Sequence, residues 1–167
     1  GDDLQQYQRN DPGWVSCEKA SNGCIYGMPS HASRVIKVDP RDSSVTAIGP
    51  DLGKGHKWFG GALGADGCIY VVPFETKKQI LKIDPATDSV TTFGDASKAC
   101  PGKWRGDTAG PAGPIYAIPS GATHVLQIDP KQQTVTAFGH DLSKYGGNAW
   151  AGGVLAADNR MYCVRCS

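Results

Sequence analysis

The sequence has no apolar run close to the roughly 20 residues that a membrane-spanning helix needs, so we expect no transmembrane segment. It also lacks an excess of either charge, because 17 Lys and Arg stand against 16 Asp and Glu. A formal net charge of +1 gives no global field that would recruit nucleic acid or an acidic membrane, so we expect no nucleic-acid partner. Peripheral association with a membrane complex stays open.

Two further absences concern chemistry. No glycine-rich phosphate loop follows a strand pattern and opens a helix, so nucleotide binding through such a loop is unsupported. The histidines stand at non-equivalent places, and no His/Glu pair has metal-ligand spacing; they are His31, His56, His124 and His140. We therefore expect no cofactor and no metal site, and we name no catalytic residue.

The chain also lacks an initiator Met and a signal-like stretch, since it begins with Gly1-Asp2-Asp3. We expect either that a targeting segment has been removed or that the sequence is a piece of a longer protein.

Glycine and proline are abundant, with 22 and 11 residues, as short strands joined by tight turns require. An internal repeat is also present, because four tryptophans each stand twelve residues before a tyrosine. These pairs are Trp14 and Tyr26, Trp58 and Tyr70, Trp104 and Tyr116, and Trp150 and Tyr162. Two further markers recur every 45 residues: Asp39-Pro40, Asp84-Pro85 and Asp129-Pro130, and then Gly49, Gly94 and Gly139. The chain is therefore a tandem array.

Within one period the pattern is that of strands and turns, as the second unit shows. Residues 58–63, 68–72, 79–83 and 89–93 are predicted strands. Asp66-Gly67 suits a tight hairpin turn, Pro73 ends the second strand, and residues 84–88 turn the chain between the third and fourth strands.

Four short strands per period of about 45 residues predict an all-β fold, a β-propeller-type array of four-stranded antiparallel blades. An open β-solenoid or a sandwich built from the same hairpins is the alternative. The small residues of the first strand, such as Gly60-Gly61 and Gly152-Gly153, fit the innermost strand of a propeller. The predicted divisions are a lead-in (1–13), three complete blades (14–57, 58–103 and 104–149) and a half blade (150–167).

Two segments resemble known propeller repeats. Leu81-Lys82-Ile83-Asp84-Pro85-Ala86-Thr87 and Gly67-Cys68-Ile69-Tyr70 are similar to the blades of kelch, YVTN and streptogramin-lyase-like proteins. The resemblance covers nearly the whole chain and implies the fold. Streptogramin-lyase-like enzymes carry a His/Glu metal-assisted site, and no matching His/Glu spacing occurs here, so the resemblance implies no activity.

The phase of the repeat at the two ends carries a further expectation. Residues 1–4 align with residues 49–52 and 139–142, which follow a fourth strand, and the chain stops after the second strand of its fourth unit. A half blade leaves apolar surface in water, so we expect completion by further blades or by another chain.

The sequence contains six cysteines and leaves three states open for them: structural disulfides, buried free thiols, and metal or redox chemistry. Their even number and abundance favour disulfides and an oxidising, extracytoplasmic or organelle-lumen compartment. The candidates are Cys17, Cys24, Cys68, Cys100, Cys163 and Cys166.

Charged residues interrupt the small-residue pattern of the first strands. If these strands line the axis, Glu18, Arg105 and Asp107 face a central channel and form a candidate ligand site at its mouth; a solvated channel wall or an ion pair is the alternative. Each repeated Asp-Pro carboxylate is interpreted as capping its own turn. The repeated Trp and Tyr are interpreted as blade-to-blade packing.

The charges also segregate between the two rims of a propeller. Segments joining strand two to strand three, and strand four to the next strand one, contain seven lysines against four carboxylates, whereas the short turns on the other rim contain seven aspartates against three cations. The lysines are Lys54, Lys57, Lys77, Lys78, Lys98, Lys103 and Lys144. Because loops on rigid scaffolds carry function, we interpret them as a partner-contact set.

The leading hypothesis is a non-catalytic protein-interaction or scaffold subunit of a larger complex. The alternative is a small-ligand or glycan binder, or a metal-assisted enzyme, with its site at the channel mouth. The alternative for the lysines is that both rims are simply solvated and bind no partner.

Overall fold

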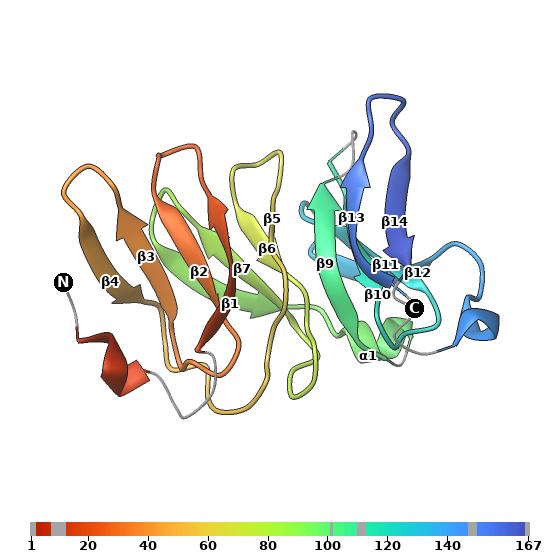
Figure 1. Ribbon diagram of the computed structural model, residues 1–167, viewed down its shortest axis with the longest axis horizontal. Coiled ribbons are helices and arrows are strands. Elements are labelled where there is room, and N and C mark those ends of the chain that lie inside the picture. The colour runs from red at the N-terminus through yellow and green to blue at the C-terminus, as the bar shows by residue number, and fades with distance from the viewer. Residues whose placement is uncertain (1–2, 8–12, 101, 110–112, 147–149, 166–167) are drawn as a thin grey trace.

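The computed structural model describes residues 3–7, 13–100, 102–109, 113–146 and 150–165. Nearly all of its regular structure is antiparallel β-sheet, in three four-stranded sheets and one two-stranded sheet (Figure 1). Each sheet is a meander, because every strand pairs with its neighbour in sequence. The predicted all-β array of three four-stranded units and a half unit is confirmed.

The strands repeat in the same order in each unit. The first sheet contains β1 (Trp14–Lys19), β2 (Ile25–Pro29), β3 (Val35–Asp39) and β4 (Ser44–Ile48). The second contains β5 (Ala62–Leu63), β6 (Ile69–Val71), β7 (Ile80–Asp84) and β8 (Ser89–Phe93). The third contains β9 (Trp104–Ala109), β10 (Ile115–Pro119), β11 (Val125–Asp129) and β12 (Thr134–Phe138), and the last contains β13 (Trp150–Leu155) and β14 (Met161–Arg165).

In the part of the chain that the structure describes, three short helical segments lie outside the sheets. They are the 3-10 helices η1 (Leu4–Tyr7) and η2 (Ser143–Tyr145) and the α-helix α1 (Ala96–Ala99). Within the described residues, no helix combines the length and the apolar character needed to cross a membrane.

One predicted strand is much shorter than expected. The sequence predicts strand one of the second unit over residues 58–63, but β5 spans only Ala62–Leu63, and Trp58 makes a single isolated bridge to Pro73. Gly60 adopts a φ of 90°, which takes the backbone out of the extended conformation. The ladder is therefore interrupted where the two glycines stand.

The core lies between the sheets, in two layers. Along β6, Ile69 and Val71 belong to the layer shared with the first sheet, whereas Tyr70 belongs to the layer shared with the third sheet. This alternation follows from the period of two along a strand. Both faces of the second sheet are therefore buried, and the units stack face to face as predicted.

The repeated tyrosines show the effect of stacking. Tyr26 and Tyr70 have no exposed surface, Tyr116 is half-buried, and Tyr162 is 52% exposed. Burial of this position therefore decreases toward the last sheet, as expected of a residue that packs between sheets. The repeated tryptophan instead bonds within its own unit. Its indole N–H donates to the backbone just before strand three, as between Trp58 Nε1 and Gln79 O at 2.9 Å.

The first strands lie innermost, because β1, β5, β9 and β13 neighbour one another in that order. A Cβ on Gly106 of β9 would come within 3.0 Å of the Gly152 backbone in β13. Side chains larger than hydrogen would not fit at this approach. The predicted role of the small residues on strand one is confirmed at this pair.

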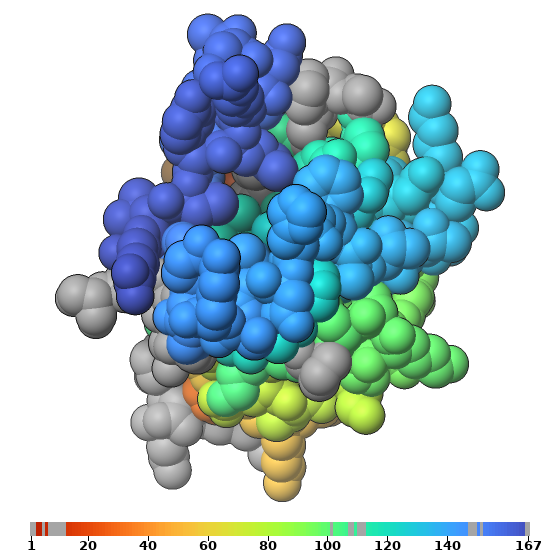
Figure 2. All heavy atoms as spheres, turned by 90° about the vertical axis from the view of Figure 1, so that its right-hand side faces the viewer, coloured from red at the N-terminus to blue at the C-terminus, as the bar shows by residue number. Residues whose placement is uncertain are grey.

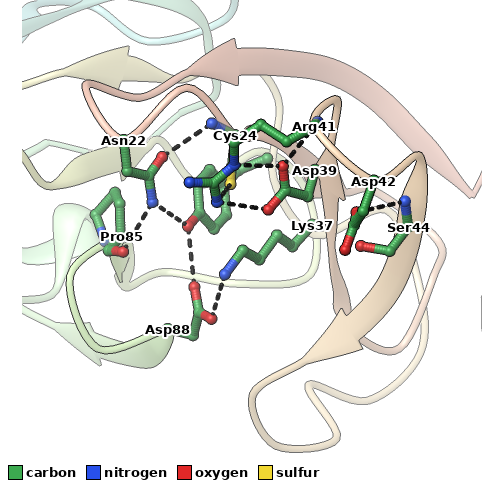
Figure 3. A network of polar contacts seen from close by, with 10 residues as sticks. Asn22, Cys24, Lys37, Asp39, Arg41, Asp42, Ser44, Pro85 and Asp88 are labelled. Atoms are coloured by element: carbon green, nitrogen blue, oxygen red, sulfur yellow. Dashed lines mark hydrogen bonds and ion pairs between the residues drawn. The ribbon is translucent and has the colours of Figure 1, made fainter.

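A polar network joins the first two sheets (Figure 3). Tyr26 donates its hydroxyl to Asp88 Oδ1 at 2.9 Å, and Lys37 Nζ lies 2.5 Å from Asp88 Oδ2. The Asn22 side chain donates to the Pro85 carbonyl at 2.9 Å. Residues of the first sheet thus hold the turn between the third and fourth strands of the second sheet.

Candidate functional site

The molecule has two faces of different construction. The connection face carries the segments that join strand two to three and strand four to one; among described residues these are 30–34, 49–61, 72–79, 94–100, 102–103, 120–124 and 139–146. The turn face carries the short turns at 20–24, 40–43, 64–68, 85–88, 130–133 and 156–160. In Figure 1 the hairpin turns lie along the upper edge and most of the longer connections along the lower edge.

Six of the seven predicted partner-contact lysines reach solvent. Lys54, Lys78, Lys98 and Lys144 are exposed, and Lys77 and Lys103 are half-buried. The prediction is wrong for Lys57, because this side chain has no exposed surface and cannot contact a partner. Its Nζ donates to Ser30 O at 2.8 Å, to Ala32 O at 2.7 Å and to Gly55 O at 3.3 Å. Carbonyl oxygens therefore replace water around this ammonium, which holds the connection segments together.

Three of the lysines that reach solvent gather around one hollow of about 540 Å³ on the connection face. It is lined by Thr76, Lys77, Lys78, Gln79, Gly94, Asp95 and Lys98. Two connections build it: the segment after β6 supplies the first four residues, and the segment between β8 and β9 supplies the rest. The lysines come together because these connections neighbour each other at the outer part of the second sheet.

The one carboxylate in the hollow is used locally. Asp95 caps α1 and accepts from Ser97 N at 3.0 Å and Ser97 Oγ at 2.6 Å. These hydrogen bonds, with Lys98 and Lys78 nearby, lower the pKa of Asp95. The backbone of α1 is tied to the same hollow, since Ala96 N donates to Lys78 O at 2.8 Å. The hollow therefore keeps an excess of positive charge.

The predicted channel residues are not brought together at one end. Glu18 pairs with Tyr26 near the β1–β2 turn, so it lies toward the turn face. Arg105 follows Trp104, whose partner is Pro119, so it lies toward the connection face. Burial raises the pKa of Glu18. Asp107 pairs with Ala117 in the middle of the ladder, and its side chain lies outside the described part of the structure.

Arg105 instead belongs to an aromatic cluster on the connection face. Its guanidinium carbon lies 5.2 Å from the centroid of Phe59 and 5.0 Å from that of Phe74, and the two ring centroids are 5.7 Å apart. His56 lies 4.5 Å from Phe74, between centroids, and 4.9 Å from His31 in a stacked arrangement. We call His31, His56, Phe59, Phe74, Glu75, Lys103 and Arg105 the inner cluster.

Charge in the inner cluster is only partly compensated. Lys103 Nζ lies 2.8 Å from Glu75 Oε1, and His56 Nδ1 lies 3.9 Å from Glu75 Oε2. Burial is the main cause of the lowered pKa of His56, against the opposing effect of Glu75. His56 Nε2 and Arg105 Nε are both buried without a hydrogen-bond partner. Such groups are costly in a protein interior, by about 1–3 kcal/mol each.

The sequence indicated Arg105 as a channel residue and Lys103 as a partner contact, but it did not indicate the rings, the histidines or Glu75 as members of one cluster. The available signal was positional: Phe59 and Arg105 each follow a repeated tryptophan, and Phe74 follows the proline that ends strand two. In a propeller, equivalent positions of neighbouring blades come together near the axis.

The described cysteines are free thiols, so the expected disulfides are not confirmed for Cys17, Cys24, Cys68, Cys100 and Cys163. Cys24 and Cys68 occupy the same position in successive units and are each buried in their own layer. Burial raises the pKa of Cys68 and Cys100, which keeps these thiols protonated at neutral pH. Cys166 lies outside the described residues. In the described ranges, no three His, Cys, Asp or Glu side chains gather as a metal-ligand group.

Stacked four-stranded meanders with their first strands side by side are the architecture of a β-propeller, and solved structures show the same arrangement. Virginiamycin B lyase from Staphylococcus aureus matches with a TM-score of 0.69 and 15% identity, over 96% of this chain and 58% of the other. Hydrazine synthase from Kuenenia stuttgartiensis matches with a TM-score of 0.71 and 16% identity, over 95% of this chain and 43% of the other. A gluconolactonase from Xanthomonas campestris matches with a TM-score of 0.62 and 16% identity, over 89% and 52%.

This chain is therefore a β-propeller repeat protein with streptogramin-lyase-like blades; the kelch part of the resemblance has no support among these structures. It belongs to the family described as "Repeat of unknown function (DUF6923)", whose model matches residues 18–163. Among curated proteins no sequence matches it. The chain spans between 43% and 58% of the length of these solved structures. Sequence identities of 15–16% show a shared fold and nothing further.

Proposed function

We propose that this propeller is a non-catalytic protein-interaction subunit of a larger complex, and that its connection face docks an acidic segment of a partner protein. The observation that carries the proposal is the hollow lined by Lys77, Lys78 and Lys98, whose one carboxylate is engaged in capping α1. Three ammonium groups around one depression favour a ligand with several negative charges.

The shape of the hollow favours a polypeptide segment. At about 540 Å³ it is large enough for several side chains, and it is open to solvent on the rim of the sheet. Lys54 extends the positive surface, because a Cβ on the preceding Gly53 would lie 3.8 Å from Lys77 Nζ. A partner strand carrying Asp or Glu at intervals would therefore meet a series of lysines rather than one.

We expect each lysine–carboxylate contact to contribute little binding free energy, and the set of contacts to contribute more. A single exposed ion pair contributes about 0–1 kcal/mol, so affinity must come from several pairs acting together. Exposed charges are also screened by salt, with a Debye length of about 8 Å at physiological ionic strength. Binding that depends on this hollow should therefore weaken steeply as salt is added.

The test compares two double variants that change net charge equally. K77E/K78E reverses the hollow, and K131E/R160E reverses two cations on the turn face, where Lys131 and Arg160 are exposed. A fluorescently labelled oligoglutamate peptide is titrated against each, and anisotropy is measured at low and at physiological ionic strength. We expect K77E/K78E to weaken binding by about tenfold or more and to flatten its salt dependence. Equal losses in both variants, or none in K77E/K78E, would contradict the proposal.

The enzymes among the structural neighbours suggest a second candidate, a propeller with a small-molecule site near its axis. The inner cluster favours it, because it holds a guanidinium and two histidines beside aromatic rings on the innermost part of the connection face.

A further inference from the structure

We infer that the inner cluster is a binding site for a small organic carboxylate with a flat apolar body, and that Arg105 is its anchor. This inference goes beyond protein docking at the lysine hollow, because it concerns different residues, nearer the axis, and a different class of ligand.

The first step is the state of Arg105. Its guanidinium is held against Phe59 and Phe74, at 5.2 and 5.0 Å from their centroids. Among the described residues no carboxylate forms an ion pair with it, and its Nε is buried without a partner. Ring contacts stabilise the cation but leave the N–H donors at the end of the guanidinium unused. The half-buried side chain can present these donors at the surface.

The second step is the charge of the surroundings. Lys103 and Glu75 form an ion pair at 2.8 Å and compensate each other. His56 lies in the same cluster, and burial lowers its pKa, so its ring is neutral at pH 7. Among the described side chains, Arg105 therefore supplies one positive charge that no carboxylate compensates. That charge matches a monoanion, and a planar guanidinium binds a planar carboxylate through two parallel hydrogen bonds.

The third step is the character of the walls. The guanidinium is flanked by phenyl rings, and the stacked imidazoles of His31 and His56 lie beside Phe74. His31, His56 and Phe59 are each half-buried, so part of their ring surface is open. A ligand whose carboxylate meets Arg105 would place its remaining atoms against rings. Flat apolar bodies gain most from such contacts, in stacked or edge-to-face geometry.

The repeat itself shows that this arrangement is local. The residue after the repeated tryptophan is Val15 in the first unit, Phe59 in the second and Arg105 in the third. The residue after the strand-two proline is Ser30 in the first unit and Phe74 in the second. Within the described units, a pair of phenyl rings against an arginine therefore occurs only between the second and third sheets. The packing interactions common to all blades therefore do not account for this arrangement of rings and arginine.

The test uses benzoate as the probe, with acetate and inorganic phosphate as comparisons. Binding to the whole 167-residue chain is followed by chemical shifts of the backbone amides in two-dimensional NMR. We expect saturable shifts centred on Phe59, Phe74 and Arg105, weaker binding of acetate, which lacks a flat body, and weaker binding of phosphate. No saturation with benzoate, or phosphate binding as tightly, would overturn the inference.

Two variants locate the anchor. R105K keeps the charge but loses the planar fork, and we expect it to weaken benzoate binding by about tenfold; R160K, on the turn face, is the matched control and should leave binding unchanged. F59L removes one of the two phenyl rings and should weaken benzoate binding severalfold. It serves as the second test if R105K proves unstable. Unchanged affinity in a folded R105K or F59L variant, or an equal loss in R160K, would overturn the assignment. K77E/K78E should retain benzoate binding, which separates this site from the docking hollow.

Discussion

Lys57 and Lys103 occupy the same position in consecutive units, each directly before a repeated tryptophan, yet their ammonium groups meet different surroundings. Lys57 Nζ is enclosed by three carbonyl oxygens at 2.7–3.3 Å. Lys103 pairs with Glu75 at 2.8 Å, and the two side chains are 45% and 42% exposed. Both lysines, each the last residue of its unit, reach back to the segment after strand two of that unit. They share a position, and we expect them to differ in the free energy that they contribute to folding.

Replacing Lys57 by Met should lower the free energy of unfolding by about 3 kcal/mol, because buried carbonyl oxygens lose their charged donor and water cannot reach them. The same change at Lys103 should cost less than about 1 kcal/mol, since water replaces an exposed ion pair. Urea denaturation of K57M and K103M measures both. Equal costs would show that the burial of Lys57 does not determine its contribution.

The lysine residues also show what the sequence could not reveal. Their number and their place on the connection segments were readable, because topology puts those segments on one face. The burial of Lys57 depends on carbonyl groups 25 and 27 residues earlier in the chain, which no local pattern indicates. The inner cluster was partly readable through Arg105, whereas its rings and histidines come from two different units.

At the scale of the element, the junctions between successive sheets are not equivalent. Asp88 joins Tyr26 and Lys37 across the first junction (Figure 3). The corresponding residue at the second junction is Gln133, and there Tyr70 donates to Asp66 within its own sheet at 2.7 Å. A cavity of about 230 Å³, lined in part by Asp66 and Pro130, lies on the turn face at the second junction.

The change Q133D should stabilise the second junction by about 1 kcal/mol. Gln133 has a φ of 52°, in the left-handed region that Asp tolerates better than Gln, and a carboxylate there would face Lys82 as Asp88 faces Lys37. Lys82 Nζ now lies 5.7 Å from the centroid of the Tyr70 ring. Chemical denaturation measures the gain, and Q132D is the matched control. A gain that is equal in Q132D, or that survives in Q133D/K82M, would contradict this account.

Most strands were predictable, because alternation and turn residues agree with the tertiary structure. The Asp84 turn forms as expected, with Ala86 N donating to Asp84 Oδ1 at 2.9 Å and Asp88 at a φ of 55°. The shortened β5 was not predicted, since the effect of Gly60 on the ladder depends on the conformation it adopts. The short helix α1 was not predicted either, although Asp95 is of a residue type preferred at a helix N-cap.

At the scale of the whole molecule, the meander topology separates two kinds of surface. Short turns with aspartates lie on one face, and longer connections with lysines and the inner cluster lie on the other. Among the described residues, the large apolar side chains that remain exposed lie in the third and fourth units, and the fourth unit, in dark blue, is turned toward the viewer in Figure 2. They are Phe138, Tyr145, Val154, Tyr162 and Val164. We expect these to be covered in the assembly by further blades or another chain.

The central claim is that recognition takes place on the connection face. The most direct test is hydrogen–deuterium exchange of the chain with and without saturating oligoglutamate peptide, read segment by segment. Protection is expected in residues 53–57, 74–79 and 94–98, which surround the lysine hollow. Protection confined to the turns at 64–68, 84–89 and 129–134, or no protection at saturation, would contradict the account.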